Sequence, residues 1–192
     1  MPLNLPNFLT FLRLCTAPFI AMLLVGDSSQ RQLIHAIVLF AIAGALDKLD
    51  GVVARRWNQT TEFGAIFDPI VDKIWIHTIN ISLLSLNAIP LWVVAILLAR
   101  DFAVAELRGG AYGQVSTRSA HWLGKFKLRA QVIYSLCCML NLTVLSYPPF
   151  LHDVLHVLTV TALGMSLFFS LASLVHYARL YGRRLTPIRH NL

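Results

Sequence analysis

Long runs of residues without a charged side chain alternate with short polar segments along this chain. The runs cover residues 14–26, 32–46, 74–99, 130–152 and 154–178. A helix needs about 20 predominantly apolar residues to cross the roughly 30 Å hydrocarbon layer of a membrane. The 74–99 run is too long for one crossing, and its segment Asn87-Ala88-Ile89-Pro90 favours a tight turn between two helices. The pattern therefore predicts six membrane-spanning helices, at about residues 5–25, 32–57, 65–86, 90–108, 124–146 and 154–179.

The composition favours an apolar solvent around these helices. Hydrophobic residues make up 57% of the 192 residues and charged residues 13%, whereas an average soluble domain has roughly 45–50% and about 25%. The mean hydropathy is +0.66, and disordered, collagen-like and coiled-coil chains are excluded. We expect an all-α integral membrane protein that forms a single domain over residues 1–192.

Charge is distributed unevenly between the two sides of the predicted bundle. Sixteen Lys and Arg residues against nine Asp and Glu residues give a formal charge of +7. Basic residues gather in the 108–129 region and in the tail after residue 178, whereas the opposite loops contain only Arg31. By the positive-inside rule, both termini and the longer loops face the cytoplasm, with the protein in a bacterial inner or plasma membrane. Topology thus explains the charge, and no nucleic-acid partner is expected.

Four aspartates lie where two predicted helices approach a short connection. Asp47 and Asp50 are three residues apart and Asp68 and Asp72 are four apart, so each pair projects from one helix face. An ionised carboxylate at the bilayer centre costs about 2.5–3.5 kcal/mol on insertion scales, which argues for a function. In a helical hairpin the two pairs would converge and attract Mg²⁺ or Mn²⁺, which prefer oxygen ligands. The alternative is an interfacial charge network with Lys48, Arg55, Arg56 and Lys73.

The spacing of these residues resembles the signature of the CDP-alcohol phosphotransferase family. The matching run is Asp47-x2-Asp50-Gly51-x2-Ala54-Arg55-x8-Gly64-x3-Asp68-x3-Asp72. The resemblance implies a six-helix bundle with a polar cavity facing the cytoplasm, a homodimer, and a reaction in which an alcohol attacks the β-phosphate of a CDP-linked lipid and releases CMP. It also implies that the four aspartates hold two Mg²⁺ or Mn²⁺ ions and that Asp72 is the general base. The residues implied for binding CDP and its diphosphate are Gly51, Ala54, Arg55, Gly64, Asn7 and Thr10.

Residues outside the signature bear on the acceptor alcohol. Segments 55–64, 99–108 and 122–127 are similar to those of family members that make phosphatidylglycerophosphate from CDP-diacylglycerol and glycerol 3-phosphate. Segment 4–13 is similar to that of these members and also to that of the cardiolipin synthases of the family. Leu128 departs from that subgroup, which commonly has Thr there. Fixed cations near the cytoplasmic helix ends suit a phosphorylated acceptor, and the residues expected to bind its phosphate are Arg100, Arg108, Lys125 and Lys127. For Arg108 and Lys127, ordinary positive-inside flanking charge is the alternative.

Three other functions fit part of the pattern. A cardiolipin synthase of the same family would use phosphatidylglycerol as its acceptor. An aspartate-rich membrane prenyltransferase would also hold a diphosphate through Mg²⁺, but such motifs lack the Gly51-x2-Ala54-Arg55 element. A non-catalytic membrane scaffold with a relict site is the third. The expected partners are CDP-diacylglycerol, glycerol 3-phosphate, membrane lipids and a second copy of the chain. His35, His77 and His176 are expected to be hydrogen-bonded within spans.

Overall fold

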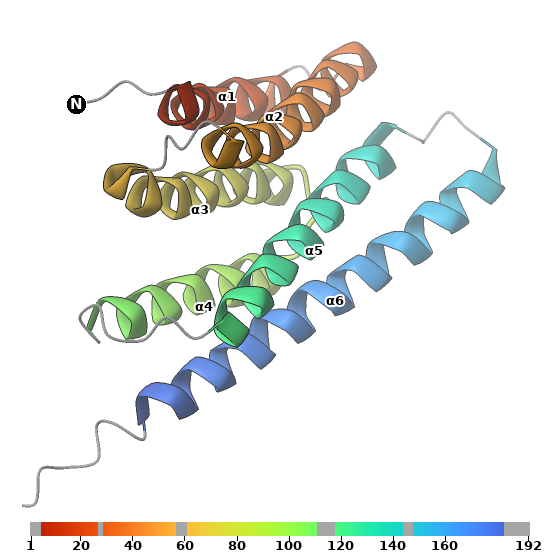
Figure 1. Ribbon diagram of the computed structural model, residues 1–192. Helices are drawn as coiled ribbons and strands as arrows, with labels where there is room; N and C mark the ends of the chain where they lie inside the picture. Colours follow the sequence, from red (N-terminus) through yellow and green to blue (C-terminus); the bar gives the residue numbers. More distant parts are fainter. Residues whose placement is uncertain (1–4, 27–28, 57–60, 111–117, 144–147, 183–192) are drawn as a thin grey trace, which may run out of the picture.

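The computed structural model describes residues 5–26, 29–56, 61–110, 118–143 and 148–182. Within these ranges, the side chains of residues 5–6, 47–56, 62, 65, 108–110, 118–121, 123 and 180–182 are outside the description. The described part is all-helical, without a strand (Figure 1). Its helices are α1 (Leu5–Val25), α2 (Gln30–Arg56), α3 (Glu62–Ser85), α4 (Leu91–Gly110), α5 (Arg118–Thr143) and α6 (Pro149–Gly182).

Each predicted segment coincides with a helix, which confirms the all-α prediction. The largest differences are at α5 and α6, which begin at Arg118 and Pro149 rather than at about 124 and 154. The prediction began these segments near the last charged residue before an apolar run, but a helix accommodates charged side chains in its first turns. Asp153, for example, lies exposed near the start of α6.

Among the residues that the structure describes, two helices have both the length and the hydropathy needed to cross a membrane. These segments are Asn7–Val25 of α1 and Pro149–Arg179 of α6, and Gln30–Leu46 of α2 is a shorter apolar segment. Large apolar side chains are exposed on both spanning candidates, including Met22 at 72% and Phe168 at 67% exposure. Exposed apolar surface of this extent is typical of contact with lipid. Both helices are candidate membrane spans, and the six crossings stay a prediction.

A tight turn joins α3 to α4, as the sequence predicts. Asn87 has a φ of 56°, the left-handed region that Asn tolerates better than most residues. The Ala88 N–H donates to the Leu83 carbonyl at 3.0 Å and the Asn87 N–H to the Leu84 carbonyl at 2.9 Å. This pair of bonds is a Schellman motif, which satisfies the carbonyls at the end of α3 and reverses the chain.

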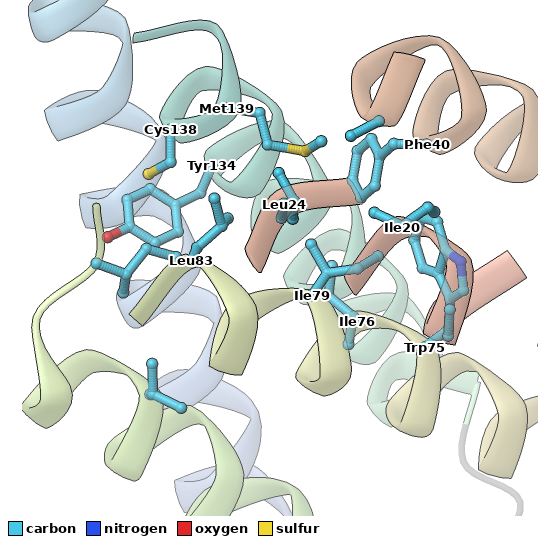
Figure 2. Close-up of a cluster of buried hydrophobic side chains, with 14 of the residues drawn as sticks. Ile20, Leu24, Phe40, Trp75, Ile76, Ile79, Leu83, Tyr134, Cys138 and Met139 are labelled. Carbon is cyan, nitrogen blue, oxygen red and sulfur yellow. The ribbon is translucent and has the colours of Figure 1, made fainter. Parts of the chain in front are cut away.

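Helices α1, α2 and α3 form one group, and α5 pairs with α6 beside it (Figure 1). Apolar side chains from α1, α2, α3 and α5 meet in the core between them (Figure 2). The rings of Phe40 on α2 and Trp75 on α3 stack with their centroids 4.8 Å apart. The Trp75 indole N–H also donates to the Thr16 hydroxyl of α1 at 3.1 Å. Trp75 therefore ties the three N-terminal helices together.

Candidate active site

A row of polar side chains on α1 contacts the acidic face of α3. The Thr10 hydroxyl donates a hydrogen bond to Asp68 Oδ1 at 2.9 Å. One turn further on, the Arg13 guanidinium donates to Asp72 Oδ1 and forms an ion pair with it. Because these contacts advance in the same direction along both helices, α1 and α3 run parallel. We call this row, with the Asn7 contact described next, the α1–α3 ladder.

The ladder begins where α3 begins. Thr61 caps α3 because its hydroxyl accepts a hydrogen bond from the Gly64 N–H at 3.0 Å. The Asn7 amide N–H donates to the same hydroxyl at 3.2 Å. A Cβ on residue 64 would lie 2.7 Å from Asn7 Oδ1, so glycine allows α1 to approach α3 closely. Asn7 and Thr10 of α1 thus contact α3, and Gly64 of α3 lies against Asn7. That these three residues bind CDP stays a prediction.

A cavity of about 470 Å³ opens beside Asp72. It lies among α1, α2, α3 and α5, and its lining residues are Arg13, Gly44, Asp72, Trp75, Leu128, Arg129, Val132 and Ile133. The Asp72 side chain is 24% exposed, whereas the Arg13 side chain is 4% exposed. Asp72 therefore reaches the cavity, while Arg13 holds the carboxylate from behind. The lining contains both charged and apolar side chains, so the cavity suits an amphipathic ligand.

The remaining signature residues lie on α2, with side chains outside the described residues: Asp47, Asp50, Gly51, Ala54 and Arg55. Their level along the bundle follows from the stack of Phe40 on Trp75. Asp47 follows Phe40 by seven residues and Asp68 precedes Trp75 by seven. Seven residues are about 10.5 Å of helix. Since α2 and α3 are consecutive antiparallel helices (Figure 1), positions 47 and 68 fall at one level.

A second group of charged residues is buried around Asp101 of α4. Lys127 Nζ donates to Asp101 Oδ2 at 2.5 Å, and Arg100 Nη1 donates to Asp101 Oδ1 at 2.6 Å. His77 Nε2 lies 3.0 Å from Asp101 Oδ2, which confirms a hydrogen-bonded role for that histidine. All four residues are buried. We call them the Asp101 cluster; it joins α3, α4 and α5.

The four cations expected to bind the acceptor phosphate have different surroundings. Arg100 reaches α6, where its Nε donates to the Ser170 carbonyl at 3.2 Å and its Nη2 to the Ser173 hydroxyl. Arg100 and Lys127 therefore have protein partners, whereas Lys125 is exposed on α5. Arg108 lies in α4, with its side chain outside the described residues.

The described half of the expected metal site has suitable chemistry. Asp68 and Asp72 present carboxylate oxygens on successive turns of α3, and hard divalent ions prefer such ligands. Within the described residues, no group of three or more His, Cys, Asp and Glu side chains could hold an ion. The side chains of the other two expected ligands, Asp47 and Asp50, lie outside the described residues. Carboxylate oxygens such as those of Asp68 and Asp72 are the donors that Mg²⁺ and Mn²⁺ prefer.

Three residues of these sites received no role from the sequence. Arg13 repeats the three-residue spacing of Asn7 and Thr10, which is the signal that could have revealed it. Asp101 interrupts an apolar run, and a carboxylate at such a position needs a partner. Arg129 has no comparable signal in the sequence, because it resembles the flanking charge around it.

The chain matches the family model described as CDP-alcohol phosphatidyltransferase over residues 3–174. A relative from Salmonella choleraesuis is 33% identical over 138 residues, which cover 69% of this chain and 75% of the relative. A relative from Bacillus subtilis is 34% identical over 68% of this chain and 73% of its own length. A relative from Yersinia enterocolitica is also 34% identical, over 69% of this chain and 74% of its own length. All three are named CDP-diacylglycerol–glycerol-3-phosphate 3-phosphatidyltransferase. From its signature, its acidic helix pair and these matches, the chain belongs to the CDP-alcohol phosphatidyltransferase family and is a transferase of phospholipid biosynthesis.

Proposed function

We propose that this chain transfers the phosphatidyl group of CDP-diacylglycerol to glycerol 3-phosphate, forming phosphatidylglycerophosphate and releasing CMP. The observation that carries this proposal is the cavity beside Asp72, whose lining combines a candidate proton acceptor with two arginines and with apolar side chains. A donor with a diphosphate and two acyl chains needs both cationic and apolar contacts. The names of the three relatives contain the same pair of substrates.

In this proposal, residues 1–192 form one catalytic domain that crosses the membrane six times. The exposed apolar surfaces of α1 and α6 support contact with lipid. The uneven distribution of Lys and Arg supports a cavity and termini that face the cytoplasm. Membrane lipids and a second copy of the chain are the proposed neighbours, and the dimer rests on the family resemblance.

Asp47, Asp50, Asp68 and Asp72 are proposed to hold two Mg²⁺ or Mn²⁺ ions. The common level of positions 47 and 68 along α2 and α3 supports this arrangement. Bound ions supply positive charge against the diphosphate and orient it. Thr10 and Arg13 hold the α3 carboxylates in place through the α1–α3 ladder. Gly51, Ala54 and Arg55 are proposed to bind the CDP part, with Gly64, Asn7 and Thr10 at its edge.

Asp72 is proposed to accept the proton of the attacking hydroxyl, because a neutral alcohol is a poor nucleophile. The acceptor oxygen forms a bond to the β-phosphorus of the donor. The bond from that phosphorus to the bridging oxygen breaks, and CMP leaves with the electron pair. Exposure of Asp72 to the cavity supports this role, since the hydroxyl must reach its carboxylate.

The acceptor phosphate is proposed to lie near the cytoplasmic ends of α4 and α5. Lys125 is exposed there, and Arg108 is the second expected ligand. Arg100 and Lys127 carry two positive charges against the one carboxylate of Asp101, so their cluster contributes net positive potential from within the bundle.

The test is an acceptor screen with purified protein, CDP-diacylglycerol and Mg²⁺ or Mn²⁺, with CMP release as the readout. We expect CMP when glycerol 3-phosphate is the acceptor and little with phosphatidylglycerol. Asp72→Asn should lose nearly all turnover while it still binds the donor, because it loses the proton acceptor and only part of the negative charge. Asp153→Asn, at an exposed position on α6, is the matched control and should match the wild type.

Three results would overturn the proposal. Turnover with phosphatidylglycerol but not glycerol 3-phosphate would make the chain a cardiolipin synthase. Release of pyrophosphate from a polyprenyl donor would indicate a prenyltransferase. No CMP with any alcohol would indicate a non-catalytic membrane protein.

A further inference from the structure

The cavity beside Asp72 contains a cation that none of the assignments above uses. Arg129 of α5 lines this cavity together with Asp72 of α3 and Arg13 of α1. Arg13 is occupied by Asp72, to which it is ion-paired. Arg129 is exposed, and its guanidinium carbon lies 5.9 Å from the centre of the Phe126 ring. In the described part of the chain, no carboxylate pairs with Arg129, so its charge is available to a ligand in the cavity.

The face of α5 distinguishes Arg129 from Lys127, one of the two lysines expected to bind the acceptor phosphate. Lys127 is 2% exposed and donates to Asp101, so it faces the bundle interior. Lys125 and Arg129 are four residues apart and therefore share one face of α5. Both are exposed, and Arg129 lies one turn further along the helix, at the cavity that Asp72 enters. This face supplies two cations in a row that ends beside the candidate base.

A guanidinium also suits the ligand chemistry. Arginine presents parallel N–H donors that match two oxygens of a phosphate, and it stays charged at all physiological pH values. The aromatic neighbour at Phe126 holds the guanidinium without neutralising its charge. From the cavity, the shared α5 face and the burial of Lys127, we propose that Arg129 binds the phosphate of the acceptor and selects phosphorylated over unphosphorylated alcohols.

This inference rests on the proposed function, and it predicts an effect on one substrate alone. In Arg129→Gln, the KM for glycerol 3-phosphate should rise about 10- to 100-fold, which is the range for losing a hydrogen bond to a charged group. The KM for CDP-diacylglycerol, and any CMP release with unphosphorylated glycerol as the acceptor, should change less than about twofold. Arg129→Lys keeps the charge and should recover most of the loss. Arg179→Gln, at an exposed position near the end of α6, is the matched control.

A binding measurement tests Arg129 without turnover. Saturating glycerol 3-phosphate should raise the thermal midpoint of the wild type and of Arg179→Gln, because a ligand that binds the folded state stabilises it. The same concentration should raise the midpoint of Arg129→Gln much less.

Each outcome separates the two hypotheses. If the wild type uses glycerol 3-phosphate and Arg129→Gln has unchanged constants, the role of Arg129 is refuted and the proposed function stands. A rise confined to the KM for CDP-diacylglycerol would assign Arg129 to the donor and also refute it. If the wild type releases no CMP, the proposed function fails. The thermal measurement then decides on Arg129, and equal midpoint shifts in the wild type and Arg129→Gln would refute its role.

Discussion

Removal of the Asp101 charge is the sharpest test of how this bundle is held together. In Asp101→Asn, Lys127 Nζ and Arg100 Nη1 lose a carboxylate that lies 2.5 and 2.6 Å away. Both cations are buried, so water cannot replace the lost counter-charge. Breaking a buried ion pair by removing one partner costs about 3–5 kcal/mol. This is a large part of the roughly 5–15 kcal/mol by which typical domains are stable.

The free energy of unfolding can be measured by denaturant titration of the protein in mild detergent, followed by tryptophan fluorescence. We expect Asp101→Asn to lower it by about 3–5 kcal/mol. The matched control Asp153→Asn, whose carboxylate is exposed, should change it by less than about 0.5 kcal/mol. Adding Lys127→Met to Asp101→Asn should restore part of the loss, because one uncompensated cation is removed. An Asp101→Asn protein as stable as the wild type would refute the reasoning.

Three further predictions concern other parts of the molecule. Gly64→Ala should lower the thermal midpoint of unfolding, because the new Cβ would lie 2.7 Å from Asn7 Oδ1. In the control Gly44→Ala, the new Cβ has no neighbouring atom within 4 Å, so the midpoint should not fall. Equal midpoints for the two variants would contradict the close approach of α1 to α3. Asn87→Val should lower the free energy of unfolding by about 1–2 kcal/mol in the same titration, because the left-handed φ of 56° disfavours a β-branched residue, and Asn87→Gly should not. Chelation with EDTA should stop CMP release and added Mg²⁺ should restore it; full activity in EDTA would argue against the metal site.

The helices of this fold could be predicted because apolar runs must be long to cross a membrane. The turn at Asn87 could be predicted because the uncharged run 74–99 is too long for a single crossing, so the chain is expected to reverse direction within it. The starts of α5 and α6 could not be predicted, because a charged residue ends an apolar run in the sequence but does not end a helix. Helix ends depend on capping groups and neighbours that the apolar pattern does not record.

Part of the candidate site follows from helix geometry alone. The spacing of Asp68 and Asp72 puts both on one face of α3, and both are observed in contact with α1. The partner of Asp72 could not be predicted, because Arg13 lies 59 residues away on another helix. The interior position of Lys127 was likewise hidden, since a buried lysine is tolerated only where a distant residue supplies the counter-charge.

The positions of the Asp101 cluster and its partners along the sequence determine the order in which their contacts can form during synthesis. When α4 leaves the ribosome, Asp101 has its neighbour Arg100 and the earlier His77, but Lys127 follows 26 residues later. Ser170, the α6 partner of Arg100, lies 70 residues downstream. At about 5–20 residues per second, the nascent chain needs roughly 4–14 s to supply it. During that interval the Arg100 guanidinium lacks its contacts with α6, so the packing of α4 in the bundle is completed only after α6 has been synthesised.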